Sequence, residues 1–476
     1  MTMFTLREAA AMIPGAVLKG EENVAIERIV TDSRGVQAGD LFVAVRGDRF
    51  DAHDFLDQVA KSGAAAALVS RDPSNVDAWP LPVIKVKDTR AALGALAHGW
   101  RKRFTMPLVA VTGSNGKTTV KEMIASIFAA AVGEESRLAT AGNFNNDIGL
   151  PLTLFRLNAS HKLAVVELGM NHPGETEALG KIAAPDVAVV NNAQREHQEF
   201  MATVEAVALE HASVIHALGE TGTAVFPADD QYAVFWRTAA TDNAIIDFAL
   251  TDDASKAAVT GTLEGTTVRM QTPQGALDVA LSVLGEHNAR NAMAATAAAL
   301  AAGVSLDAIK RGLESFQPVK GRLQVKRAIL GALAGATVID DTYNSNPDSM
   351  RAAIDVLASQ AAPRVLVMGD MGEVGEEGPA FHREVGAYAA ERGIDALFAL
   401  GVASVDSVNA FNAQASKQTA QHFGDVTEMV AALERAGYGN NATYLAKGSR
   451  FMKMERVVDA LTTPQQPAAG NAPAAH

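Results

Sequence analysis

The residues with the clearest chemical meaning lie at positions 111–119, where the sequence is VTGSNGKTT. Glycines let backbone N–H groups face a phosphate, and a helix that begins directly after them adds partial positive charge. Lys117 can neutralise β- and γ-phosphate oxygens, and Thr118 can ligate Mg²⁺. A short apolar strand, Leu108–Val111, precedes this turn, and an amphipathic helix follows it. This context favours a phosphate-binding loop over a plain Gly-Lys turn, although the usual spacing places glycine where Val111 stands.

Two further chargeable residues follow predicted strands of the same unit. Glu167 ends the strand Leu163–Val166, and His197 lies in a polar loop after the strand Val187–Val190. Ligand groups collect at the carboxyl ends of strands in an open α/β sheet, and a carboxylate there suits Mg²⁺. Position alone leaves Glu167 open between a metal ligand and a helix cap. A lone histidine is more often structural, and no His-Glu-x-x-His motif supports a zinc peptidase.

Three amides stand close together at Asn143, Asn145 and Asn146. They offer fixed donors and acceptors to a polar ligand, but Asn is also a common turn residue. On their own, they favour a turn.

Chargeable groups also follow three predicted strands near the carboxyl end of the chain. The segments are 340–347 (DDTYNSNP), 368–373 (MGDMGE) and 447–450 (KGSR). Three such ends in one sheet favour a single site over three unrelated loops.

The elements that must position these residues are those of an α/β protein. At roughly 150 residues per domain, 476 residues predict about three domains. Short strands fill the first hundred residues, and strands alternate with helices in the two units that follow, as in parallel sheets. We predict units at 1–105, 106–320 and 321–461, with a disordered tail at 462–476, which is rich in Pro, Ala and Gln.

Composition excludes several kinds of protein. The count of Cys is 0, which excludes disulfides, thiolate metal sites and cysteine nucleophiles. The net charge of −13 argues against a protein that works mainly on nucleic acid. The most apolar stretch, Ala292–Gly303, is too short to span a membrane, and Arg7 and Glu8 interrupt any signal peptide. We therefore expect a cytoplasmic protein that acts on small molecules.

These motifs together resemble the Mur ligases, the ATP-dependent amide ligases of peptidoglycan synthesis, from Thr31 to about Arg450. The family's ATP loop has the shorter form found here, which accounts for Val111. The resemblance implies that Glu167 and His197 bind Mg²⁺ and that the motif Glu286–Asn291 lies near adenine. It also implies a small UDP-binding first domain, a central P-loop-type ATPase domain with a mainly parallel sheet, and a Rossmann-like third domain.

Details within the family imply that the enzyme joins D-alanyl-D-alanine to the tripeptide carboxyl of a UDP-muramoyl precursor, through an acyl phosphate. The motifs 31–34 (TDSR) and 39–44 (GDLFVA) are shared with the member that adds the third residue. The segment 341–347 (DTYNSNP) and the absence of an Asp-Asn-Pro-Arg motif separate this chain from that member. Two alternatives remain: the third-residue enzyme, and a P-loop ATPase switch without ligase activity. The sequence does not say whether the third residue is diaminopimelate or lysine.

The expected site residues follow from these motifs and from the resemblance. Catalytic roles are expected for Lys117, Glu167 and His197, and Mg²⁺ ligation for Thr118, Glu167 and His197. Expected ATP contacts are Gly113, Ser114, Asn115, Gly116, Lys117, Thr118, Thr119, Asn288, Asn291, Arg322, Asp340 and Asn344. Expected substrate contacts are Ser33, Arg34, Asn143, Asn145, Asn146, Asn346, Asp370 and Lys447. We expect a monomer without a nucleic acid partner.

One position departs from the family. Most members carry a carbamylated lysine fourteen residues after the position of His197, and here that position is His211. Imidazole is a poor match for Mg²⁺, so we expect that His211 is not a direct ligand. We expect it to donate a hydrogen bond to phosphate or a metal-bound water, or Glu210 to supply the missing charge. The alternative is that His211 only packs on its helix.

Overall fold

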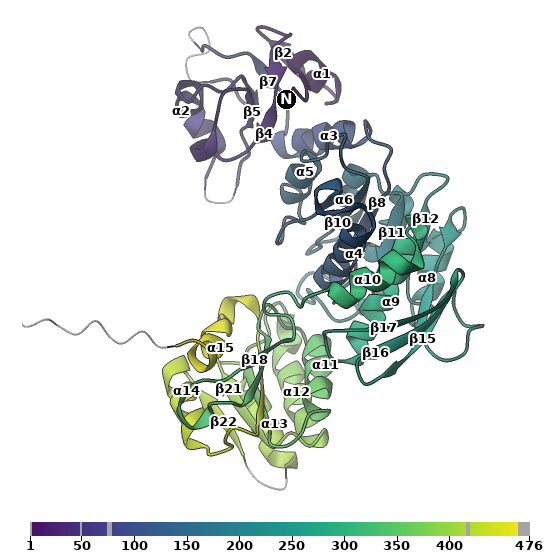
Figure 1. The fold of residues 1–476 in the computed structure, drawn as a ribbon. Coiled ribbons are helices and arrows are strands. Elements are labelled where there is room, and N and C mark those ends of the chain that lie inside the picture. Colours follow the sequence, from purple (N-terminus) through teal and green to yellow (C-terminus); the bar gives the residue numbers. More distant parts are fainter. Residues whose placement is uncertain (1, 48–49, 74–78, 416–418, 465–476) are drawn as a thin grey trace, which may run out of the picture.

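The computed structural model describes residues 2–47, 50–73, 79–415 and 419–464. Most of the predicted disordered tail lies outside these ranges. Figure 1 shows three α/β units in chain order, with the first and the last at opposite ends of the central one. The predicted α/β fold class with three units is confirmed, whereas the exact domain boundaries stay a prediction. No helix in the described ranges has the length and apolarity needed to cross a membrane.

The first unit contains a five-stranded sheet of order β2-β7-β6-β5-β4, parallel except at β2. Its strands are β2 Val17–Lys19, β4 Arg28–Val30, β5 Asp40–Val43, β6 Ala66–Val69 and β7 Val83–Lys85. Its helices are α1 Leu6–Ala11, α2 Leu56–Lys61 and α3 Thr89–Arg101. The stretch 26–30, predicted as one strand, is divided. Ile26 belongs to β3 Ala25–Ile26 and pairs with β1 Phe4–Thr5, while β4 pairs with β5.

The central unit contains a six-stranded parallel sheet of order β13-β12-β11-β8-β10-β9. Its strands are β8 Leu108–Thr112, β9 Arg137–Ala139, β10 Leu163–Glu167, β11 Val187–Val190, β12 Thr223–Val225 and β13 Ala244–Ile245. Strands buried on both faces explain their continuous apolar runs. Because β8 lies between β10 and β11, the three segments singled out in this unit meet at one edge of the sheet.

Helices cover both faces of the central sheet (Figure 1). They are α4 Lys117–Val132, α5 Gly149–Leu154, α6 Glu175–Ala183, α7 Val204–Ala212, α8 Ala233–Ala239, α9 Glu286–Ala301 and α10 Leu306–Ser315. The alanine-rich stretch of α9 is buried against α4 and the second sheet of this unit. Small side chains permit this close packing, so the stretch is a core helix.

That second, four-stranded sheet was not predicted. It consists of β14 Phe248–Leu250, β15 Val259–Glu264, β16 Thr267–Thr272 and β17 Gly275–Ala280, and only β14 and β15 pair in parallel. In β16, Val268 and Met270 are buried, whereas Arg269 and Gln271 are exposed. This alternation is the signal of a sheet with one wet face, and the sequence analysis did not use it.

The third unit contains a six-stranded sheet of order β18-β19-β23-β20-β21-β22, parallel except at β18. Its strands are β18 Gln324–Arg327, β19 Thr337–Asp341, β20 Arg364–Gly369, β21 Ala396–Leu400, β22 Ala420–Phe423 and β23 Thr443–Lys447. Helices α11 Pro347–Ala358, α12 Gly378–Glu391 and α13 Val405–Gln414 pack on one face, and α14 Val426–Arg435 and α15 Glu455–Thr462 on the other. In this register Asp341 of β19 lies beside Lys447 of β23.

Candidate active site

The glycine-rich turn joins β8 to α4, as predicted. Gly113 and Gly116 have φ angles of 131° and 81°, which L side chains rarely adopt. A Cβ atom on Gly116 would also lie 2.5 Å from Asn291 Oδ1. Val111 is buried within β8 and takes no part in the turn. Backbone conformation and space both require glycine at position 116.

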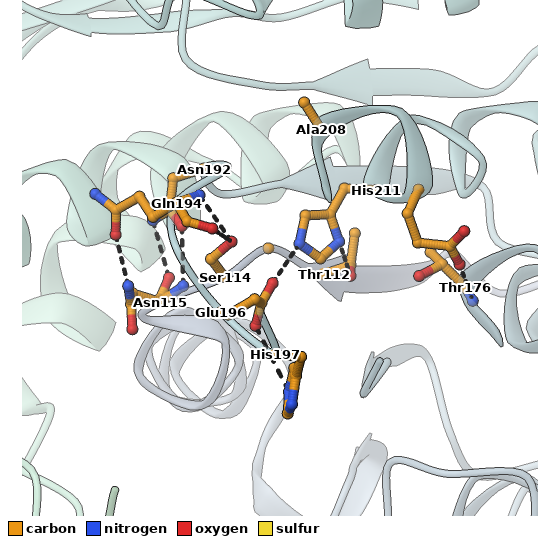
Figure 2. A network of polar contacts seen from close by, with 12 residues as sticks. Thr112, Ser114, Asn115, Thr176, Asn192, Gln194, Glu196, His197, Ala208 and His211 are labelled. Carbon is orange, nitrogen blue, oxygen red and sulfur yellow. Dashed lines mark hydrogen bonds and ion pairs between the residues drawn. The ribbon is translucent and has the colours of Figure 1, made fainter. Parts of the chain in front are cut away.

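The loop that follows β11 holds this turn in place (Figure 2). The Asn115 backbone N–H donates to Asn192 Oδ1 at 2.9 Å, and Asn191 Nδ2 donates to the Asn115 carbonyl at 2.8 Å. The Gln194 backbone N–H donates to Ser114 Oγ at 2.9 Å. These bonds fix the turn before any ligand binds, which is the preorganisation that phosphate binding needs.

Lys117 begins α4 and turns back over the loop. Its Nζ donates to the carbonyls of Gly113 and Ser114, the latter at 3.1 Å, and lies 3.3 Å from Glu196 Oε2. Glu196 is only 5% exposed. Burial opposes ionisation of its carboxyl, but Lys117 and His211 outweigh that effect and lower its pKa to about 2. Glu196 was not among the predicted site residues, although it directly precedes His197.

His211 is the second partner of Glu196, and the expectations for this residue need correction. Its side chain is 0% exposed, with Nε2 lying 2.8 Å from Glu196 Oε1 and Nδ1 3.0 Å from Thr112 Oγ1. Both ring nitrogens are therefore engaged by other side chains of the protein, and the residue does more than pack. Glu210 does not supply charge to the site, because its carboxylate accepts from the backbone N–H groups of Gly174 and Thr176 at 2.8 Å each.

The three predicted Mg²⁺ ligands, Thr118, Glu167 and His197, line one cavity. Glu167 Oε1 accepts a hydrogen bond from Asn145 Nδ2 at 2.8 Å. Its Oε2 is buried and has no hydrogen-bond partner among the described residues. A buried carboxylate oxygen without a hydrogen-bond partner at a strand end is suited to bind a hard cation. The side chains of Thr118, Glu167 and His197 therefore fit Mg²⁺. Within the described ranges, however, no three His, Asp or Glu side chains already form a cluster that could hold a metal.

His197 lies at a strained position in the same loop. Its φ is 46°, and its Nδ1 lies 2.8 Å from Oε2 of Glu373, a residue of the third unit. Contact with His197 lowers the pKa of Glu373. The third unit therefore brings a carboxylate to the predicted metal site.

The cavity has a volume of about 1090 Å³ and reaches all three units, since Arg90 of α3 also lines it. A second cavity of about 330 Å³ adjoins it beyond the phosphate loop. The predicted residues that line one or both cavities are Ser114, Asn115, Gly116, Lys117, Thr118, Thr119, Asn143, Asn145, Asn146, Glu167, His197, Asn288, Asn291, Arg322, Asn344, Asn346 and Lys447. The structure thus brings most of the predicted site together.

Five predicted residues line neither cavity: Ser33, Arg34, Gly113, Asp340 and Asp370. Gly113 acts through its backbone conformation. Asp340 is 1% exposed and accepts from Lys326 Nζ at 2.7 Å and from Thr342 Oγ1 at 2.6 Å. Successive strand residues point to opposite faces, so the neighbouring Asp341 lines the small cavity instead, paired with Lys447 at 2.7 Å.

The other three serve local structure in this arrangement. Asp370 accepts from the backbone N–H groups of Ala403 and Ser404 at 3.1 and 2.8 Å, where it secures the turn after β21. Ser33 and Arg34 form a short 3₁₀ turn in the first unit. The exposed Arg34 pairs with Asp32 at 2.6 Å.

Three further contacts join the central and third units around the cavity. Asn346 Nδ2 donates to Asn115 Oδ1 at 3.0 Å, and Arg322 donates to Thr118 Oγ1 at 3.1 Å. Arg195, which the sequence analysis missed, binds Asp348 and Glu384, with Nη1 of Arg195 2.7 Å from Glu384 Oε2. These carboxylates raise the pKa of Arg195 above its usual value.

Comparison with known proteins agrees with this geometry. Family models described as Mur ligase catalytic domain, Mur ligase middle domain and Mur ligase glutamate ligase domain match residues 25–101, 111–299 and 321–450. The UDP-N-acetylmuramoyl-tripeptide–D-alanyl-D-alanine ligases of Haemophilus influenzae and Escherichia coli are 41% and 40% identical to this chain. These alignments cover 95% and 94% of the chain, and 97% and 96% of the relatives.

Solved structures give the same result. A crystal structure of MurF from Acinetobacter baumannii superposes with a TM-score of 0.86 at 35% identity, over 96% of this chain and 98% of that one. MurF ligase from Thermotoga maritima in complex with ADP has a TM-score of 0.79 at 27% identity, over 91% and 96% of the two chains.

A phosphate loop at the end of a parallel sheet, closed by a second α/β unit across one cavity, defines an ATP-dependent enzyme whose site is shared between units. The chain belongs to the Mur ligase family.

Proposed function

We propose that this protein is the ATP-dependent ligase that adds D-alanyl-D-alanine to UDP-N-acetylmuramoyl-tripeptide in peptidoglycan precursor synthesis. One observation carries the proposal. The phosphate loop and the polar strand ends of the third unit face each other across a single large cavity. The relatives named for this reaction, which match nearly the whole chain, supply the identity of the substrates.

The reaction has two steps. The terminal carboxylate of the tripeptide attacks the γ-phosphorus of ATP, forming an acyl phosphate and releasing ADP. The amine of D-alanyl-D-alanine then attacks the acyl carbon, an amide bond forms, phosphate leaves with the bonding electrons, and the amine loses a proton. Phosphoryl transfer depends mainly on positioning and on electrostatic stabilisation. Lys117 meets that need with a cation held at the mouth of the loop.

A Mg²⁺ ion held by Thr118, Glu167 and His197 would neutralise part of the phosphate charge. The unpartnered Glu167 Oε2 supports this assignment. Asn145 orients Glu167 through a hydrogen bond, so at least one of the three predicted asparagines has a role beyond a turn.

The smaller cavity is the proposed adenosine site. It lies beyond the phosphate loop and is lined by His287, Asn288 and Asn291 from the start of α9 and by Leu323 and Asp341 from the third unit. ATP bound in both cavities would contact two units at once. A bound nucleotide therefore stabilises the closed arrangement, which keeps water from the acyl phosphate.

The test is ATP hydrolysis measured with and without the UDP-tripeptide and D-alanyl-D-alanine. We expect that sustained ADP formation over many turnovers requires both substrates and matches the amide product one to one. Hydrolysis indifferent to both would favour an ATPase switch. The same assay with the UDP-dipeptide and diaminopimelate tests the member that adds the third residue, and a preference for those substrates would refute the proposal.

The proposal includes a monomer in the cytoplasm. The cavity is lined by the three units of a single chain, which supports a monomer, and the use of ATP supports a cytoplasmic location. Light scattering of the purified protein would test the first point, because a stable dimer at micromolar concentration would contradict it.

A further inference from the structure

Four side chains form a continuous series of polar contacts beside the phosphate loop; three of them are buried, and the fourth, Lys117, is partly exposed. Thr112 Oγ1 lies 3.0 Å from His211 Nδ1, His211 Nε2 lies 2.8 Å from Glu196 Oε1, and Glu196 Oε2 lies 3.3 Å from Lys117 Nζ. Figure 2 shows His211 between Thr112 and Glu196. This series of contacts runs from the core of the sheet to Lys117, the lysine expected to contact ATP.

Burial makes this arrangement demanding. A carboxylate removed from water is tolerated only when it is paired and hydrogen-bonded, and Glu196 has one partner on each oxygen. His211 is completely buried, so bulk water does not reach its contact with Glu196. In the tautomer whose Nε2–H donates to Glu196, Nδ1 can accept from the Thr112 hydroxyl.

The anchoring groups belong to rigid elements. Thr112 is the last residue of β8, and His211 lies in α7, whereas Glu196 is in the loop between β11 and α7. His211 therefore ties a loop carboxylate to the sheet. Glu196 in turn is the charged member of the three acceptors around Lys117 Nζ, since the other two are backbone carbonyls.

The family resemblance expects a carbamylated lysine at position 211, and an imidazole cannot carry that group. The carboxylate in contact with the His211 ring is Glu196, so this chain has an anion beside the phosphate loop without modification. Glu196 also lies 4.0 Å from His197 Nε2, on the side of the predicted Mg²⁺ ligands.

We propose that Glu196 and His211 form a positioning pair for the phosphate-binding site: Glu196 directs the Lys117 ammonium, and His211 holds the Glu196 carboxylate. This role rests on the proposed ATP-dependent function but not on the identity of the acceptor substrates. Neither residue is expected to exchange a proton or a bond with substrate.

The experiment combines two single variants with their double variant. In Glu196→Gln, in His211→Leu and in the double variant, turnover and the Mg²⁺-dependent affinities for a non-hydrolysable ATP analogue and for AMP are measured. We expect each single change to lower turnover at least about tenfold. We also expect each to lower the affinity for the ATP analogue, relative to the affinity for AMP, at least about tenfold. The double variant should lie within about threefold of either single one, because the two residues act as a unit.

Two controls separate positioning from general damage. Glu199→Gln alters an exposed glutamate of the same loop and should leave both readouts within about twofold of wild type. His211→Gln keeps a donor toward Glu196 and should recover most of what His211→Leu loses. A purely structural role would lower both affinities together and leave their ratio unchanged.

Three results would overturn the proposal: additive effects in the double variant, an unchanged affinity ratio in Glu196→Gln, or equal losses in His211→Gln and His211→Leu. If Glu196→Gln does not fold, the two His211 variants decide alone. Wild-type protein that binds the ATP analogue but forms no amide would refute the proposed substrates, while the affinity ratios would still test the pair.

Discussion

At the scale of single residues, the site depends on a few charged side chains that are buried or partly buried. Lys117 is the cation of the proposed phosphate loop, and Lys117→Ala removes its charge while leaving the loop glycines in place. We expect turnover to fall at least about 100-fold, the effect of losing one preorganised charge contact. Lys310→Ala is the matched control, because Lys310 is an exposed helix residue whose ion pair, among the described residues, is with Glu314 of the same helix. Near-normal turnover in Lys117→Ala would refute its catalytic role.

A second residue-scale prediction concerns dissolved CO₂. His211 stands where a carbamylated lysine is expected, and both of its ring nitrogens are already engaged. We therefore expect that stripping bicarbonate from the assay and restoring it leaves turnover unchanged. A reversible loss of turnover would show that another lysine becomes carbamylated and that residue 211 is not the equivalent position.

The same scale shows what sequence could and could not predict. Lys117 was predicted from the glycine-rich motif between a strand and a helix, whereas the strand-end positions of Glu167 and His197 became metal-ligand predictions only through the family resemblance. The choice between Asp340 and Asp341 depends on which face of β19 each side chain occupies, and adjacent acidic residues give no sign of it. Glu196 was missed because its partners, Lys117 and His211, come from two other elements and only the folded chain assembles them.

At the scale of elements, the junction of β8, the loop and α4 is specified more by glycine than by charge. Gly116→Ala would strain a residue at φ 81° by roughly 1–2 kcal/mol and place its Cβ against Asn291. Gly133→Ala, at the end of α4, is also strained, at φ 89° and ψ 152°, but its Cβ would meet no atom within 4 Å. We expect both variants to lose thermal stability, and only Gly116→Ala to lose ATP-analogue affinity, at least about tenfold. Equal affinities in the two variants would show that the close approach to α9 is unimportant.

The prediction of secondary structure from the sequence was also incomplete at this scale. The parallel strands β8, β10 and β11 were predicted near their true positions because strands buried on both faces are continuous apolar runs, whereas β9, β12 and β13 of the same sheet were not predicted. The sheet β14–β17 was missed because its strands alternate, and three of them pair antiparallel within a unit expected to be parallel. Its inner face packs on α9, so it supports the helix that presents Asn288 and Asn291 to the smaller cavity.

At the scale of the whole molecule, the reaction requires the third unit to lie over the phosphate loop and to leave it again. We predict that nucleotide together with the UDP-substrate compacts the protein through a rigid rotation of residues 322–461, hinged near Pro318–Gly321. In this structure the third unit already contacts the loop through Asn346 and Arg322. Small-angle scattering with and without both ligands tests the motion, and an identical profile at saturation would count against it.

Arg195 makes that closure testable by mutation. Its guanidinium binds Asp348 and Glu384 of the third unit, and its own backbone N–H donates to Asp348 Oδ2 at 2.8 Å. Partly buried, charge-assisted contacts of this kind hold two surfaces in one register. Arg195→Gln should therefore expand the ligand-free protein and raise the ligand concentration needed for compaction several-fold. Arg383→Gln, which breaks an exposed pair with Asp406 inside the third unit, should change neither the size of the ligand-free protein nor the ligand concentration needed for compaction.

Because Arg195 directly precedes Glu196 and His197, opening of the contact between Arg195 and the third unit would also release the loop that carries these two residues. Turnover in Arg195→Gln should then fall together with compaction, and a variant that compacts normally yet loses turnover would place the role of Arg195 in the loop alone.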